Sequence, residues 1–127
     1  INEALRPLIG NRIYGCDDCQ LACPWNKFAQ VSPLPDWQAR EGLGAGSIVQ
    51  LMAWTETEFL RRTEGSAIRR IGHARWLRNL ALAAGNALAS GAVTASERQA
   101  LQQGLVAQAG HPDPVVQEQV AWSLAKF

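Results

Sequence analysis

The chain has 127 residues, of which 47% are hydrophobic and 18% are charged, and its formal net charge is +1. This is enough for one globular domain with its own core, and it excludes a disordered chain. No apolar run approaches the roughly 20 residues that a membrane helix needs, and no secretory leader is visible. The chain starts at Ile1 rather than at a methionine. We therefore expect a monomeric part of a longer protein, with no membrane segment.

All three cysteines lie in one short stretch, GCDDCQLACPW, which spans residues 15–25. Their spacing matches the last three cysteines of the C-x2-C-x2-C-x3-C-P run of bacterial ferredoxins, with Ile13 in place of the first cysteine. In that register Cys16 and Cys19 bind one iron–sulfur cluster, and Cys23 binds another. Each cluster needs further thiolates from elsewhere, because this chain has no other cysteine.

Trp25 and Asn26 follow the last cysteine and its proline directly, so we expect them to lie near a cluster. A zinc site completed by His73 or His111 is an alternative, although C-x2-C-x3-C-P is not a usual zinc spacing. Cysteines grouped this closely are typical of reduced thiols, which predicts a cytoplasmic protein. We take residues 1–30 as part of a ferredoxin-like segment.

A linker is predicted next, over residues 31–46, because VSPLPDWQAREGLGAG is rich in proline and glycine and lacks helical periodicity. A helical body follows over residues 47–127. Its first segment, residues 47–54, predicts a short helix. The next helix starts at Thr55, where Glu58 three residues later indicates a capping box.

Three further helices are expected from apolar residues at helical spacing. The longest covers residues 73–90. The next begins with a capping box of Thr94 and Glu97. Its expected buried stripe consists of Leu101, Leu105 and Val106. The last helix takes Asp113 as its N-cap and Pro114 as its first residue.

A repeat is visible when residues 75–87, RWLRNLALAAGNA, are aligned with residues 115–127, VVQEQVAWSLAKF. The offset of 40 residues falls in the range of HEAT and armadillo units. We therefore expect an all-α fold, in which a HEAT-like helical repeat domain follows the partial ferredoxin-like segment. Asn79 and Asn86 in the longest helix are expected to bond to backbone or to a neighbouring helix rather than to a substrate.

Six arginines between residues 61 and 78 make up half of the basic residues of the chain. Arginine forks suit phosphate oxygens, so the patch is a candidate nucleic-acid surface. The first candidates are Arg69, Arg70, Arg75 and Arg78, and the second are Arg61 and Arg62. The alternative is a solvated helix face with intrahelical pairs, such as Glu58 with Arg62.

Two stretches of the sequence resemble the epoxyqueuosine reductases. LRPLIGNRIYGCDDCQLACPWNKFA, residues 5–29, resembles the second cluster-binding segment of that family. GSAIRRIGHARWLRNLALAAGN, residues 65–86, resembles the segment that opens its C-terminal helical-repeat domain. Together they cover about a third of the chain.

The resemblance implies an oxidoreductase that uses cobalamin and two [4Fe-4S] clusters to reduce epoxyqueuosine to queuosine in the tRNA anticodon loop. It implies that Cys16, Cys19 and Cys23 bind the clusters together with cysteines outside this chain. The clusters would receive electrons from a separate donor. It also implies that the arginines hold the tRNA anticodon stem-loop.

Cobalamin and the proton-donating acid would belong to the part of the protein that precedes this chain. The resemblance thus implies that the chain alone is inactive and that its isolated cysteine segment lacks intact clusters. A different class remains open from the residues themselves: an electron-transfer ferredoxin module fused to a protein-binding helical solenoid.

Overall fold

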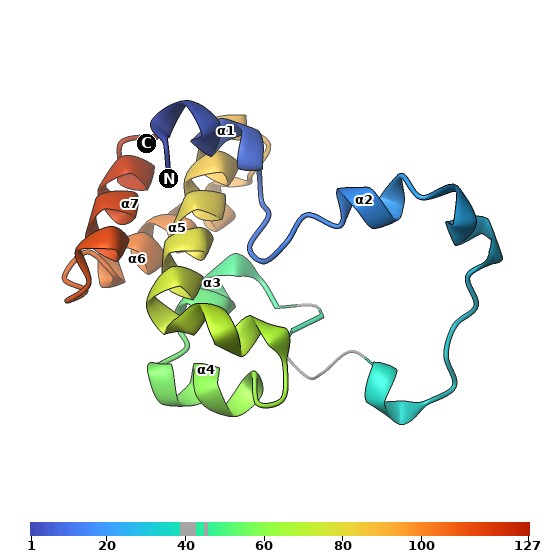
Figure 1. Ribbon diagram of the computed structural model, residues 1–127. Helices are drawn as coiled ribbons and strands as arrows, with labels where there is room; N and C mark the ends of the chain where they lie inside the picture. Colours follow the sequence, from blue (N-terminus) through green and yellow to red (C-terminus); the bar gives the residue numbers. More distant parts are fainter. Residues whose placement is uncertain (39–42, 45) are drawn as a thin grey trace.

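The computed structural model describes residues 1–38, 43–44 and 46–127, and within these ranges all regular elements are helices (Figure 1). The prediction of an all-α chain is confirmed. Part of the predicted linker, residues 39–42 and 45, lies outside the described residues. The α-helices are α1 (Arg6–Ile9), α2 (Asp18–Leu21), α3 (Ile48–Met52), α4 (Glu56–Arg62), α5 (Gly72–Ser90), α6 (Ala95–Ala107) and α7 (Pro114–Leu124). The 3-10 helices are η1 (Glu3–Leu5), η2 (Pro24–Phe28), η3 (Pro35–Trp37) and η4 (Ala67–Ile71).

Helix α5 is the centre of the helical body, and α1, α3, α4, α6 and α7 all pack against it. Its buried residues include the unbroken run 80–85, so the middle of the helix is buried on all sides, and Trp76, Leu77 and Leu88 extend the buried surface toward both ends. The helix ends at Gly91, whose φ of 69° lies in the left-handed region that stops a helix. The core consists of Leu51, Met52, Phe59, Trp76, Leu77, Leu80, Ala81, Ala84, Leu88, Leu101, Leu105, Val116 and Val120.

Helices α5 and α7 lie side by side and run in the same direction (Figure 1). The ring centroids of His73, at the start of α5, and His111, just before α7, are 6.4 Å apart. Further along, the Ser123 hydroxyl donates a 2.7 Å hydrogen bond to the Ala81 carbonyl. The backbones approach closely there because the neighbouring position on α5 is Gly85, which has no Cβ to meet Ser123.

The predicted helix starts are largely confirmed. Thr94 and Glu97 form a reciprocal capping box, and Asp113 caps α7 through the Val115 amide. At Thr55 only half of the predicted box forms, since its side chain accepts from the Glu58 amide. The Glu58 carboxylate does not bond back to Thr55, because it is held by two arginines instead.

One predicted core position of α6 is wrong. Leu101 and Leu105 are buried, but 56% of Val106 is exposed. The two leucines are four positions apart and share one face of the helix, whereas Val106 is rotated about 100° from Leu105. That single buried stripe suffices to pack α6 against its neighbours.

The N-terminal residues belong to the same packed unit through a buried arginine. Arg6 is 4% exposed, and its Nε donates to the Ile1 carbonyl at 3.0 Å. Its Nη2 forms an ion pair with Glu118 of α7, and its guanidinium lies over the Trp122 ring at 5.5 Å from the centroid. These contacts fix η1 and α1 against the end of α7.

Among the helices in the described ranges, none combines the length and apolar character needed to cross a bilayer.

Candidate cluster-binding arm and arginine surface

The cysteines lie on a segment that extends away from the helical body, residues 14–38, which we call the cysteine arm (Figure 1). Cys16 precedes α2, Cys19 lies within it, and Cys23 directly precedes η2. Cys16 and Cys19 are exposed, Cys23 is half-buried, and all three are free thiols. The turn before α2 is tight, since Gly15 has a φ of 67° and Asp17 a φ of 55°.

These thiols do not assemble a metal site by themselves. In the part of the chain that the structure describes, no three His, Cys, Asp or Glu side chains are grouped so that they could hold a metal ion. The histidines of the zinc alternative bond elsewhere: His73 Nε2 lies 2.8 Å from the Trp54 carbonyl, and His111 Nδ1 accepts from the Asp113 amide. The chain therefore offers thiolates that fit only part of a ligand set.

Trp25 and Asn26 lie on the arm directly after Cys23. Trp25 is 73% exposed and its ring packs against Phe28, with centroids 5.6 Å apart. The Asn26 side-chain amide donates to the Gln20 carbonyl, which ties η2 back to α2 around Cys23. Their place beside a cluster remains a prediction.

The six candidate arginines all lie near the end of the body where α5 begins, and we call them the arginine surface. Its members are Arg61 and Arg62 on α4, Arg69 and Arg70 on η4, and Arg75 and Arg78 on α5. Arg69 and Arg70 are exposed, as is Arg75, and Arg78 is half-buried. The local sequence explains this arrangement, because η4 leads directly into the first turns of α5.

Arg75 and Arg78 line a surface cleft of about 550 Å³, which we call the arginine cleft. Burial lowers the pKa of Arg78 from its ordinary value, and the charge of Arg75 lowers it further. Glu56, His73 and Asp113 also line the cleft. Asp113 is engaged as the cap of α7, with its carboxylate 2.8 Å from the Val115 amide. The cleft thus places two guanidinium groups together where an anion would stabilise both.

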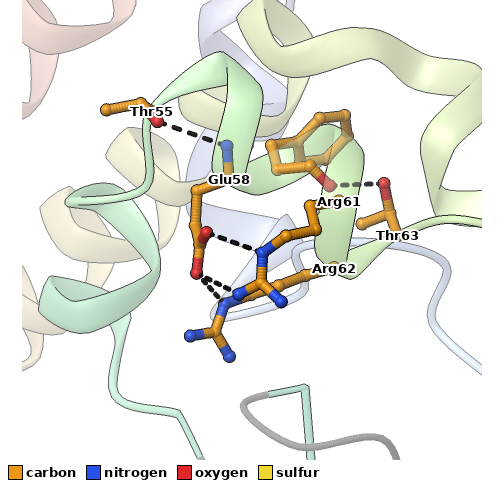
Figure 2. A network of polar contacts seen from close by, with 6 residues as sticks. Thr55, Glu58, Arg61, Arg62 and Thr63 are labelled. Atoms are coloured by element: carbon orange, nitrogen blue, oxygen red, sulfur yellow. Dashed lines mark hydrogen bonds and ion pairs between the residues drawn. The ribbon is translucent and has the colours of Figure 1, made fainter.

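Arg61 and Arg62 are arranged differently, because both reach the Glu58 carboxylate, as Figure 2 shows. Arg61 bonds to the two Glu58 oxygens at 3.1 and 2.9 Å. Arg62 also lies over the Trp54 ring, 5.1 Å from its centroid. The intrahelical pairing with Glu58 that the sequence suggested therefore forms, and contact of these two arginines with RNA stays a prediction.

Curated relatives of the chain share one description. It is 59% identical over 126 residues to an epoxyqueuosine reductase of Alicycliphilus denitrificans, 54% over 128 residues to one of Burkholderia pseudomallei, and 48% over 126 residues to one of Escherichia coli. These alignments cover 98–99% of this chain. The chain belongs to the epoxyqueuosine reductase family. It matches the C-terminal part of those proteins and spans about a third of their length.

No protein-family model matches the chain. No solved structure matches it either.

The chain has two asparagines whose partners sequence reasoning did not identify. Asn79 Nδ2 donates to the Ile13 carbonyl at 2.7 Å, and Asn86 Nδ2 donates to the Arg6 and Gly10 carbonyls at 2.9 and 2.8 Å. The prediction that they bond to backbone is correct. Their partners lie more than sixty residues away, in the segment that leads to the cysteines, which no local pattern could indicate.

Three further residues beside Cys16 were also missed in this family member. Arg12, Tyr14 and Trp76 line a hollow of about 350 Å³ together with Cys16. Arg12 Nη2 bonds to both carboxylate oxygens of Asp18, at 3.1 and 3.2 Å, and so closes the loop around the cysteine. A cysteine spacing alone does not indicate such neighbours, although an arginine four residues before a cysteine and an aspartate two residues after it were visible.

We expect Glu58 to make the stability of the chain depend on pH. Its hydrogen bond from Arg61, followed by that from Arg62, lowers its pKa from 4.5 to about 2. The pKa of Glu58 is lower in the folded chain than in the unfolded chain. Ionised Glu58 therefore stabilises the folded chain above pH 4.5, and this stabilisation is lost as the pH falls toward about 2. The thermal midpoints of the native chain and Glu58→Gln should differ above pH 4.5 and converge near pH 2.

Arg61→Ala is the matched control, because it removes the largest cause of the shift. In that variant the pKa of Glu58, followed by NMR of its carboxyl carbon, should rise toward 4.5. A native Glu58 that already titrates near 4.5 would contradict the pairing.

Proposed function

We propose that this chain is the part of an epoxyqueuosine reductase that supplies cysteine ligands to two [4Fe-4S] clusters and holds the tRNA anticodon stem-loop. The whole protein would reduce epoxyqueuosine to queuosine in that loop, and this part would be inactive alone. The observation that carries the proposal is the identity of 59% over 99% of the chain with a protein of that name. The free thiols and the arginine surface support the division of roles.

Cys16 and Cys19 would bind one cluster and Cys23 the other, with the remaining thiolates supplied from outside this chain. The clusters, when bound, would pass electrons from a donor toward cobalamin, which the rest of the protein would hold. Large apolar side chains of the cysteine arm are exposed, which supports packing of the arm against that remaining part. They are Leu21, Trp25, Phe28, Val31 and Leu34.

The arginine cleft would bind backbone phosphates of the anticodon stem. Arg75 and Arg78 present forked donors there, and the exposed Arg69 and Arg70 extend the positive surface next to it. Such contacts position an RNA without reading its sequence. The parallel packing of α5 and α7 supports a HEAT-like repeat, since equivalent helices of successive units stack in the same direction.

The test is binding of the chain to a tRNA anticodon stem-loop across a salt series. We expect Arg75→Ala/Arg78→Ala to weaken binding by about tenfold to a hundredfold, and to reduce the slope of log affinity against log salt by about 2. The loss follows because each arginine that contacts a phosphate releases bound counterions. Fluorescence anisotropy at each salt concentration gives both quantities.

Arg98→Ala/Lys126→Ala is the matched control, because it removes the same charge from the opposite end of the helix pair. Arg98 bonds to the Leu88 carbonyl near the end of α5, and Lys126 follows the end of α7. The control should bind RNA nearly as the native chain does. Equal losses of RNA affinity in both double variants would mean that binding depends only on the net charge of the chain. No binding at all would favour an electron-transfer module with a protein-binding solenoid.

A further inference from the structure

Asn79 stands between the arginine surface and the cysteine arm. Its side-chain oxygen accepts from its neighbour on α5, with Arg78 Nε at 3.1 Å and Nη2 at 2.8 Å. Its side-chain nitrogen donates to the Ile13 carbonyl at 2.7 Å. Ile13 is three residues before Cys16. One amide therefore joins a candidate phosphate ligand to the backbone that leads into a candidate cluster ligand.

Arg78 itself borders both places. It lines the arginine cleft together with Arg75. It also lines a second hollow, of about 350 Å³, together with Ile13, Cys16 and Asn79. Arg78 thus contributes to the lining of both hollows, so a change in its position alters both.

The hydrogen bonds of the three groups form one continuous connection. A guanidinium has five N–H donors, and Arg78 uses two nitrogens on Asn79, which leaves donors for an anion in the cleft. A charged donor polarises the amide that accepts from it, and this strengthens the bond that the amide donates onward. The two bonds from Arg78 also fix the direction of the Asn79 amide, so an anion that restricts the motion of Arg78 restricts Asn79 to the orientation that holds Ile13.

We infer that Asn79 is a positioning residue that couples phosphate binding in the arginine cleft to the attachment of the loop that carries Cys16. The inference rests on the proposed function, because the phosphate is that of the bound RNA stem-loop. RNA binding tightens the loop against α5, and by thermodynamic linkage the attached loop favours RNA binding by the same factor. The bound RNA and the loop that carries Cys16 are thereby held in a fixed relative position.

Asn86 supplies a matched control on the same helix. It lies two turns further along the same face of α5 and likewise donates to backbone carbonyls of the N-terminal segment, at Arg6 and Gly10. Among the described residues, its hydrogen bonds go to those backbone carbonyls rather than to a guanidinium group. Asn86→Ala therefore loosens the segment without interrupting the connection from the cleft.

The experiment uses the metal-free chain with Cys19→Ser and Cys23→Ser, so that a nitroxide can be attached to Cys16 alone. The motion of the label is read from the EPR line shape with and without a saturating anticodon stem-loop, and RNA affinity is measured on the same samples. RNA should slow the label in the parent chain and in Asn86→Ala. In Asn79→Ala the label should no longer respond, and RNA affinity should fall about threefold to tenfold.

Each other result overturns the inference. If the parent chain binds RNA but the motion of its label does not change, the coupling is absent and the proposed function is unaffected. A response that persists in Asn79→Ala would mean direct contact of RNA with the label, and a response lost in Asn86→Ala would mean general loosening. Absence of RNA binding in the parent chain would remove the proposed function as well.

Arg78→Met serves if Asn79→Ala does not fold. It leaves the bond from Asn79 to Ile13 in place but removes the donors on the cleft side. At saturating RNA its label should not respond, and a normal response would overturn the inference.

Discussion

Gly85→Ala is expected to lower the free energy of unfolding by about 2 kcal/mol, although alanine is the better helix former. A Cβ at this position would lie 2.7 Å from Ser123 Oγ, 2.9 Å from its Cβ and 3.0 Å from its Cα. The last of these is backbone, so α5 and α7 must move apart. The separation also weakens the bond from the Ser123 hydroxyl to the Ala81 carbonyl, which lies at a buried position.

Gly104→Ala is the matched control, because Gly104 also lies inside a helix. An added Cβ there would meet only Met52 and Val49 side-chain atoms at 3.9 Å, an ordinary contact distance. We expect this variant to be more stable than the native chain by about 0.5–1 kcal/mol, through helix propensity. Urea unfolding followed by circular dichroism measures both. A Gly85→Ala variant as stable as the native chain would show that the two helices are not in tight contact.

Arg6→Ala is expected to have the second large effect, a loss of about 2 kcal/mol in the attachment of residues 1–13 to the helical body. The buried guanidinium joins the Ile1 carbonyl, the Glu118 carboxylate and the Trp122 ring, and its stem fills space beside α7. Amide hydrogen exchange should increase in residues 1–13 and change little in α5. That pattern follows because the core of the body does not include Arg6.

Arg12→Ala provides the comparison for Arg6→Ala within the same segment. Its ion pair with Asp18 is exposed, with 42% and 60% of the two side chains accessible, so the change should be below about 1 kcal/mol. Equal effects of the two variants would contradict the role of burial at Arg6. A large effect at Arg6 alone would show that the cysteine arm starts from a fixed point on the body.

Much of the local structure could be predicted from the sequence. The capping boxes and the proline-led start of α7 depend on residues three or four positions apart, so short patterns contain the information. The cysteine spacing and the two quoted stretches likewise sufficed to indicate the epoxyqueuosine reductase family, which the relatives confirm. The cluster ligands and the RNA contacts stay predictions.

The sequence alone determined where several helices begin and which family the chain belongs to. Only the tertiary structure decided that Arg75 and Arg78 border a cleft that Glu56, His73 and Asp113 also line. It also decided that Asn79 and Asn86 hold the N-terminal segment. The physical reason is range: helix signals act over one turn, whereas these partners meet only after α5 has packed against the chain's distant ends.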